Sequence, residues 1–257
     1  MTDSSFTQKI VEGHATPPVG EMLSFLRQHR KLALLEMLCV CVTIVLSLTG
    51  NASVAKDVLV QVAFLHGVLW GVLGASGIVS DDIHSGTVAY YLQKTNSLRG
   101  FYFRQFAVRI AGLLVVTLML GGAMLVLRLL GSLESAELRR YFSVALLLSS
   151  LNATIVYAMS AAAVRRDAVS AVVYMLSTAA VAVRMAAQKG TGAAVLRLFL
   201  FPVDALLEVV GAGGRRESDL PGSVVLAFQF LLWLLLAYFI TDRGIARSVQ
   251  LSSTNTE

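Results

Sequence analysis

Asp81, Asp82 and His84 lie close together in the first half of the chain, and their side chains are suited to chemistry. Carboxylate and imidazole groups are common metal ligands and general bases. A working site normally needs further groups, and the sequence has no second acidic cluster to complete a metal site. An enzyme that uses these residues is therefore one hypothesis. It depends on the elements that position them.

The composition is typical of a protein that lies in a membrane. The chain is 56% hydrophobic and 14% charged, against about 25% charged residues in soluble domains, and its mean hydropathy is +0.72. A spanning helix needs about 20 apolar residues. The sequence predicts an all-α polytopic membrane protein with six transmembrane helices, at residues 32–48, 59–79, 106–130, 141–164, 168–187 and 223–240.

The segment before the first span, residues 1–31, is too polar to cross a membrane. After Pro17 and Pro18, a helical pattern puts Met22, Phe25 and Leu26 on one face, which predicts a helix lying in the membrane interface. An early continuation of the first span is the alternative. The expected organisation is this N-terminal segment, a membrane domain at 32–240 and a tail at 241–257.

Basic residues predict the orientation. Arg27, Arg30 and Lys31 precede the first span, whereas Lys56 stands alone in the next loop. Basic residues accumulate on the cytoplasmic side of membrane proteins. We therefore expect a multi-pass protein of the cell (inner) membrane with both termini in the cytoplasm, which also places residues 78–105 there.

Residues 78–105 form the longest polar interruption between two apolar segments in this half of the chain. Gly86 is expected to end a helix, and Asn96 or Ser97 to cap the next one. Between them, residues 88–92 form a short aliphatic and aromatic patch. The pattern favours a short cytoplasmic docking element, with an ordinary loop that packs on its own spans as the alternative.

A second irregular segment lies between the fifth and sixth spans. Residues 193–200 and 203–210 are apolar but short, and they join at Pro202. A single span through them would bring Arg197, Asp204 and Glu208 into the bilayer, at about 2.5 to 3.5 kcal/mol each near the centre. We expect a re-entrant helical hairpin instead, with Pro202 opening its second helix.

Some polar residues lie within or near the ends of the predicted spans, where such side chains normally face protein or a watery cavity. His66, Asn152 and Gln229 are candidates for a substrate path, although a hydrogen bond between helices is the simpler explanation of His66. Glu36 is expected to reach the membrane interface. Gly67, Gly71 and Gly74 form a small-residue stripe that would let another helix approach closely.

Together these features resemble the ABC-2 type permease family, the membrane subunits of ATP-binding cassette exporters. In that family the second span ends in an acidic residue, followed by Gly-Thr or Gly-Ser, an apolar stretch, a Pro and a basic residue. The matching residues here are Asp82, Gly86-Thr87, Val88 to Leu92, and Arg104. The Pro is missing, and Lys94-Thr95-Asn96 stand in its place.

The resemblance implies a permease that dimerises, with itself or a close homologue, on two copies of a separate ABC ATPase subunit. ATP and Mg would bind to that subunit, and this chain would need no cofactor and would not be an enzyme. The sequence contains no G-x-x-x-x-G-K-[ST] phosphate loop. The residues expected to couple the two proteins are Asp81, Asp82, His84, Gly86, Thr87, Tyr90, Tyr91 and Leu92.

Two other functions stay open, an intramembrane enzyme and a membrane scaffold or assembly subunit that moves no substrate. The net charge of +5 suits contact with anionic membrane lipids and requires no nucleic acid.

Overall fold

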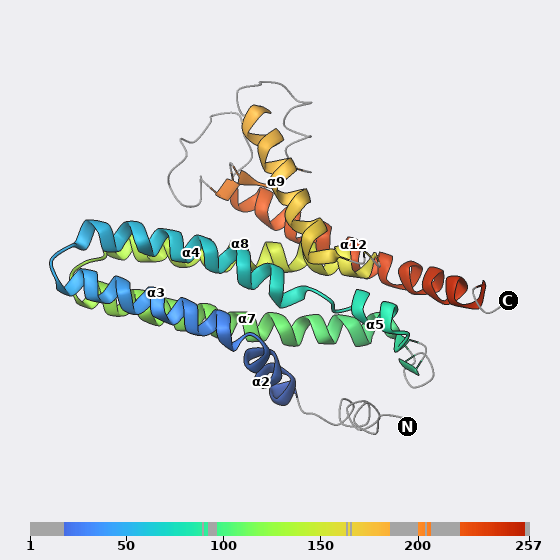
Figure 1. Ribbon diagram of the computed structural model, residues 1–257. Coiled ribbons are helices and arrows are strands. Elements are labelled where there is room, and N and C mark those ends of the chain that lie inside the picture. The colour runs from blue at the N-terminus through green and yellow to red at the C-terminus, as the bar shows by residue number, and fades with distance from the viewer. Residues whose placement is uncertain are drawn as a thin grey trace.

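The computed structural model describes residues 18–88, 90–91, 97–162, 164, 166–185, 200–203, 205–206 and 222–254. Throughout these residues every regular element is a helix (Figure 1). Several residues used in the sequence predictions lie outside the described residues: Leu92, Lys94, Asn96, Arg197, Asp204 and Glu208. The helices are α2 (Pro18–Gln28), α3 (Arg30–Leu48), α4 (Ala52–Ala75), α5 (Ser80–Ser85), α7 (Leu98–Leu129), α8 (Ser135–Ala161), α9 (Asp167–Met185) and α12 (Gly222–Thr254).

Five helices in the described part of the chain are long and apolar enough to cross a membrane: Arg30–Leu48, Ala52–Ser85 (with the turn before α5 included), Leu98–Leu129, Ser135–Ala161 and Val224–Thr241. They confirm an all-helical protein with several membrane-spanning segments. The predicted fifth span corresponds to α9, where Asp167–Ala182 is a shorter apolar helix.

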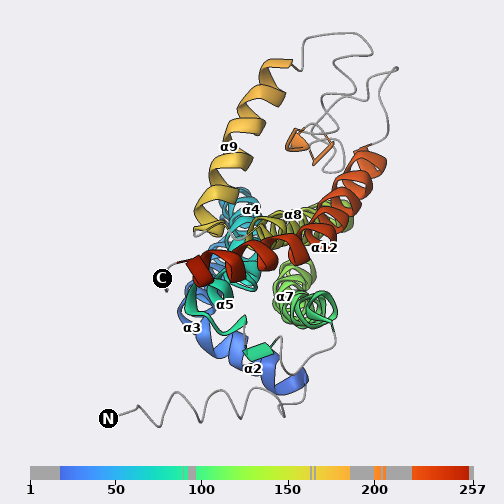
Figure 2. The same cartoon turned by 90° about the vertical axis from the view of Figure 1, so that its right-hand side faces the viewer.

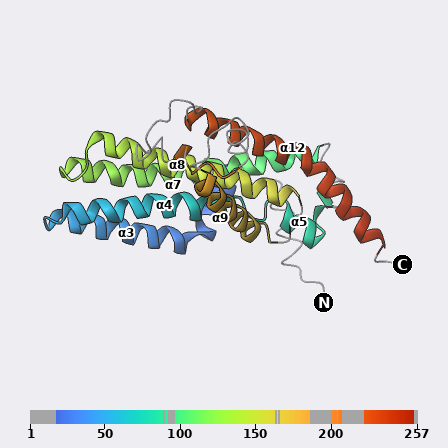
Figure 3. The same ribbon diagram turned by 90° about the horizontal axis from the view of Figure 1, so that it is seen from above.

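The first four long helices form two hairpins. α3 and α4 run antiparallel, α7 and α8 do the same, and the two hairpins lie side by side (Figures 1 and 3). The most extensive packing joins α4 to α8, and α12 packs mainly along α8. α9 contacts α8 and α4 and then leans away from the bundle (Figure 1).

α2, α5 and the C-terminal end of α12 lie at one end of the bundle, and the connections within the two hairpins lie at the other (Figure 1). Figure 2 looks onto the first of these ends, where α12 crosses in front of the hairpins. At the opposite end, Lys56 Nζ lies 3.1 Å from the carboxylate of Glu137, and the hydroxyls of Ser47 and Ser132 are hydrogen-bonded.

Capping residues set several helix boundaries. The Ser97 side chain accepts a hydrogen bond from Gly100 N at 3.2 Å, which confirms its predicted role and starts α7 at Leu98. A capping box formed by Glu134 and Glu137 starts α8. α12 continues beyond residue 240 to Thr254, so the described part of the predicted tail is helical.

α2 is helical as predicted, but part of its apolar face turns into the bundle. Phe25 is buried with Trp70 and Leu113 in one apolar cluster, and its ring centroid lies 6.0 Å from that of Trp70. Leu23, by contrast, is 57% exposed. The side chain of Met22 lies outside the described residues. Phe25 therefore anchors α2 to the protein.

The predicted glycine stripe lies where α4 meets its neighbours. A Cβ at Gly71 would lie 2.6 Å from the Ser149 carbonyl oxygen of α8, and one at Gly67 would lie 2.8 Å from Leu148. A Cβ at Gly74 would make ordinary contact, 3.4 Å from Leu113 of α7. Gly67 and Gly71 are therefore the positions that allow α4 and α8 to pack closely.

We expect Gly71→Ala to destabilise the protein by about 1 to 3 kcal/mol, because the new methyl group would overlap the backbone of α8. The measurement is thermal unfolding of the purified chain in detergent. The matched control is Gly122→Ala on α7, where an added Cβ meets nothing within 4 Å and alanine favours the helix. Equal unfolding temperatures for the two variants would contradict the close packing.

Candidate functional site

The candidate site is built on a break between α4 and α5. α4 ends at Ala75, residues 76–79 form a turn, and α5 begins at Ser80. Gly77 has a φ of 73°, a conformation that glycine adopts without strain. A Cβ at this position would also overlap the carboxylate of Asp81. The predicted second span, residues 59–79, therefore ends in a tight turn, and α5 is a separate short helix beyond it.

Side chains from three other helices bind the backbone of this turn. Arg109 Nη1 of α7 donates to Ser76 O at 2.8 Å, and Gly77 N donates to Asp167 Oδ2 of α9 at 2.8 Å. Ser160 Oγ of α8 accepts from the backbone nitrogens that follow, at 2.9 and 3.0 Å. A helix break leaves backbone groups without partners, and these side chains supply them. We call Arg109, Ser160 and Asp167 the junction clamp.

The junction clamp also binds a side chain of α5. Ser80 Oγ donates to Asp167 Oδ2 at 2.9 Å and lies 3.2 Å from Ser160 Oγ, which donates to it. Ser80 and Ser160 are buried, and Asp167 is only 6% exposed. The second oxygen of Asp167 accepts from Ala168 N at 2.7 Å, at the helix end where a negative charge is favourable. α5 is thus fixed to α8 and to the first turn of α9.

The opposite side of α5 is exposed. Asp81, His84, Ser85 and Gly86 all face outward, and the φ of 76° at Gly86 confirms that this glycine ends the helix. His84 Nδ1 lies 2.6 Å from Ser80 O within the same helix. This helix therefore has one buried side, held by the protein, and one side available to a partner.

Asp82 and Thr87 stabilise the end of α5 from within the chain. Thr87 Oγ1 donates to the Asp82 carboxylate at 3.1 Å and lies 3.2 Å from the Asp82 carbonyl oxygen. Both residues are half-buried. Of the predicted coupling residues, this pair shapes the element, whereas Asp81, His84 and Gly86 form its outer surface.

The apolar patch after α5 packs partly on the chain itself. Val88 is 2% exposed, so this residue of the patch packs within the chain. The ring centroid of Tyr91 lies 4.6 Å from that of Phe101 at the start of α7. Burial and the nearby Asp82 carboxylate raise the pKa of Tyr91. Tyr90 stacks edge-on against Tyr91 at 5.9 Å.

The three candidates for a substrate path form hydrogen bonds with different neighbours. Asn152 Nδ2 donates to Gly67 O at 3.1 Å, and Gln229 Nε2 donates to Leu200 O at 2.8 Å. His66 faces α3 and α7, as described next. None of these hydrogen bonds joins one candidate to another.

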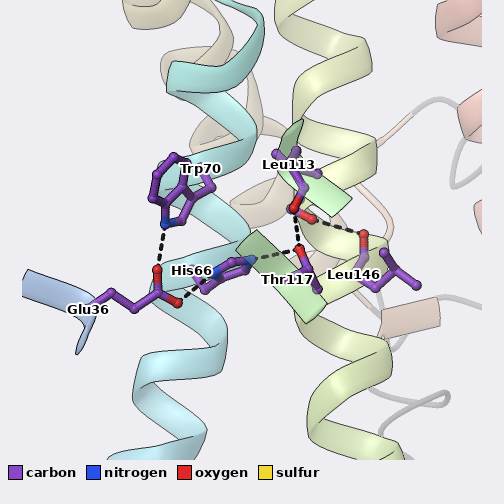
Figure 4. A network of polar contacts seen from close by, with 7 residues as sticks. Glu36, His66, Trp70, Leu113, Thr117 and Leu146 are labelled. Carbon is purple, nitrogen blue, oxygen red and sulfur yellow. Dashed lines mark hydrogen bonds and ion pairs between the residues drawn. The ribbon is translucent and has the colours of Figure 1, made fainter. Parts of the chain in front are cut away.

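Figure 4 shows the contacts of His66. Its Nδ1 lies 2.6 Å from Glu36 Oε1, and its Nε2 lies 2.9 Å from Thr117 Oγ1. Trp70 Nε1 donates to Glu36 Oε2 at 2.6 Å. Glu36 therefore binds two residues of α4, whereas the sequence analysis directed it toward the membrane interface. The sequence did contain a signal for such a partner, since Glu36 is an acidic residue in an apolar run. Acidic residues in that setting usually pair with another polar group.

The structure gives no support to a metal site at α5. In the part of the chain that the structure describes, no three His, Cys, Asp or Glu residues are placed to hold a metal ion. Asp82 points to Thr87, and His84 uses Nδ1 for its own helix.

The sequence analysis missed the whole junction clamp. Arg109, Ser160 and Asp167 were not singled out. Their partners lie far away in the sequence, so no local pattern joins them to the turn at 76–79. The one local signal was Asp167 at the start of a predicted span, where an acidic residue is common.

Comparison with known proteins finds no match to this chain among family models, curated proteins or solved structures. The resemblance to the ABC-2 type permeases thus rests on the short motif and on the order of the elements. The assignment of a function depends on the geometry described above.

We expect Ser160→Ala to loosen α5 from the bundle. The change removes the acceptor of two buried backbone N–H groups, Val79 N and Ser80 N, and each unsatisfied group costs about 1 to 3 kcal/mol. Hydrogen–deuterium exchange at residues 79–85 should accelerate about tenfold or more in the purified chain.

The matched control is Ser177→Ala on α9. This exposed serine donates only to Tyr174 O of its own helix at 3.0 Å, so its loss should leave exchange at α5 unchanged. Unchanged exchange at residues 79–85 in Ser160→Ala would show that the clamp does not hold α5.

Proposed function

We propose that the chain is the membrane-spanning permease subunit of an ABC exporter and that α5 receives the movement of a separate ATPase subunit. The observation that carries the proposal is the two-sided environment of α5. Its exposed side offers Asp81, His84 and Ser85, and its buried side is bound by α8 and α9 through Ser160 and Asp167.

This geometry suits the transmission of force. A loop that lacked internal contacts would move without displacing the membrane helices. α5 cannot move without breaking or carrying the hydrogen bonds of the junction clamp, so a displacement of α5 acts on α8 and α9. Tyr91 adds a contact with α7 through Phe101. The motif that resembles the ABC-2 permeases, Asp82 with Gly86-Thr87, lies in this same segment.

The placement of basic residues supports a cytoplasmic location for this end. α2, α5 and the end of α12 lie together (Figure 2), where an ATPase could reach α5. Exposed basic residues on these helices and at the starts of α3, α7 and α9 include Arg27, Arg30, Lys31, Arg104, Arg166 and Arg243. Basic residues near spans favour the cytoplasmic side, so both termini are placed there.

In the proposed arrangement α9 is the fifth of six spans. The re-entrant hairpin predicted at residues 193–210 lies mostly outside the described residues. Support for the second arm comes from its described start, where Leu206 N donates to Pro202 O at 3.0 Å, as in the first turn of a helix. Gln229 of α12 binds Leu200 O immediately before this turn.

The proposed assembly contains two copies of this chain, or one copy with a close homologue, on two ATPase subunits that bind ATP and Mg. The chain itself would provide the substrate path and no catalytic group. Support for a lipid or protein environment around α3 comes from Leu34, Leu35 and Leu38, which are 64%, 56% and 61% exposed.

The proposed orientation is tested by cysteine labelling in a chain whose Cys39 and Cys41 are replaced by alanine. We expect Ser85→Cys and Asn51→Cys to react from opposite sides of the membrane, because both positions are exposed and they lie at opposite ends of the bundle. A membrane-impermeant maleimide on whole cells and on inverted vesicles measures this. Reaction of both positions from the same side would overturn the topology.

The proposed coupling is tested with the ABC ATPase that a neighbouring reading frame is expected to encode. We expect the double variant Asp81→Ala, His84→Ala to weaken binding of that ATPase about tenfold or more, because interface anchors contribute about 2 kcal/mol each. Stimulation of ATP hydrolysis in proteoliposomes should fall with it. The helices should keep their thermal stability, because both side chains are exposed.

The control is Ser177→Ala, which changes an exposed side chain on α9 and should leave ATPase binding unchanged. Normal binding and stimulation by the double variant would show that α5 is not the coupling element. The absence of any ATPase that binds the wild-type chain would overturn the permease proposal itself.

A further inference from the structure

Glu36 and His66 form a pair of ionisable side chains inside the apolar helices. His66 is 2% exposed on α4, and the side chain of Glu36 on α3 is 13% exposed. A single unpaired charge at such depth is costly. The ionisation of the pair therefore matters, and the neighbouring donors and acceptors define it.

Thr117 fixes which ring nitrogen of His66 carries hydrogen. Thr117 Oγ1 donates to Leu113 O at 2.9 Å, the usual bond of a helical threonine to the preceding turn. A hydroxyl has one hydrogen, so Thr117 Oγ1 can only accept from His66 Nε2, which lies 2.9 Å away. His66 Nε2 must then bear a hydrogen.

The other ring nitrogen faces Glu36. In a neutral imidazole with hydrogen on Nε2, Nδ1 is a bare acceptor. It lies 2.6 Å from Glu36 Oε1, and an ionised carboxylate would place a second acceptor opposite it. Glu36 Oε2 is already occupied by Trp70 Nε1, a donor at 2.6 Å. The short contact between Oε1 and Nδ1 therefore requires one more hydrogen.

We propose that Glu36 and His66 form a proton-binding site within the membrane helices, with one proton held between Glu36 Oε1 and His66 Nδ1. Whether this proton is bonded to oxygen or to nitrogen, the pair has no net charge. The site thereby avoids the cost of a single buried charge. This assignment does not depend on the proposed coupling to an ATPase.

The surrounding elements bring few other titratable groups. His29, where α2 meets α3, contacts Trp70 with 6.0 Å between ring centroids. Burial and then the charge of Arg109 lower the pKa of His29, so it adds no positive charge at neutral pH. On α3, Cys39 lies one turn from Glu36, and α7 and α8 bring Arg109, Tyr141 and Tyr157 at the ends of their apolar stretches.

The test uses the full chain with its other three histidines, His14, His29 and His84, replaced by glutamine, and with ¹⁵N-labelled His66. We expect nitrogen NMR in nanodiscs at neutral pH to show hydrogen on Nε2. Infrared spectroscopy should show a carboxylic acid band that disappears in Glu36→Gln, or NMR should show hydrogen on Nδ1 as well.

Glu36→Gln is the matched variant, because its amide can accept from Trp70 and donate to His66 Nδ1 without an ionisable proton. In that variant we expect a neutral His66 with hydrogen on Nε2 only. Two results would overturn the proposal. One is hydrogen on Nδ1 with a bare Nε2, which means that Thr117 has turned its hydroxyl to the ring. The other is a bare Nδ1 beside an ionised Glu36.

Discussion

A helix that breaks in apolar surroundings leaves backbone donors and acceptors that must find partners elsewhere. The break at residues 76–79 imposes this constraint on the whole bundle. Its partners are side chains of three helices that lie far from the break in the sequence, Arg109, Ser160 and Asp167. α7, α8 and α9 must therefore meet at the end of α4, and the position of α5 follows from their meeting.

α4 is the central helix because it has a different contact on each side. Gly67 and Gly71 permit close packing against α8, whereas His66 and Trp70 hold α3 through Glu36. Polar hydrogen bonds inside apolar surroundings select one register between helices, which van der Waals packing alone specifies less sharply. The hydrogen bonds of α4 thus fix where the helices lie, and its glycines fix how closely they approach.

The sequence predicted those features that depend on local patterns. Apolar runs located the spanning helices, Gly86 ended α5, and Ser97 began α7, because each follows from the chemistry of a few neighbouring residues. The glycine stripe on α4 was also readable from its spacing. The candidate site was predicted only in part, since Asp81 and His84 lie on its exposed side as expected while Val88 is buried within the chain.

The remaining features depend on residues that are distant in the sequence. Nothing near Asp167 indicates that its carboxylate binds Gly77 N and Ser80 Oγ. Glu36 and His66 were each noticed as polar residues in apolar runs, but their pairing requires the antiparallel register of α3 and α4. A single sequence contains the hydrogen-bonding groups, and the packing of the helices decides which of them meet.

The cross-links also differ along the length of the bundle, and this difference bears on how it can move. The two hairpins are joined at the hairpin end by Lys56 with Glu137, in the middle by His66 with Thr117, and at the α5 end by the junction clamp. Three separated links prevent rotation of one hairpin against the other. Of these three links, α9 takes part only in the last. The hydrogen bonds that fix α5 therefore also hold α5 against the start of α9.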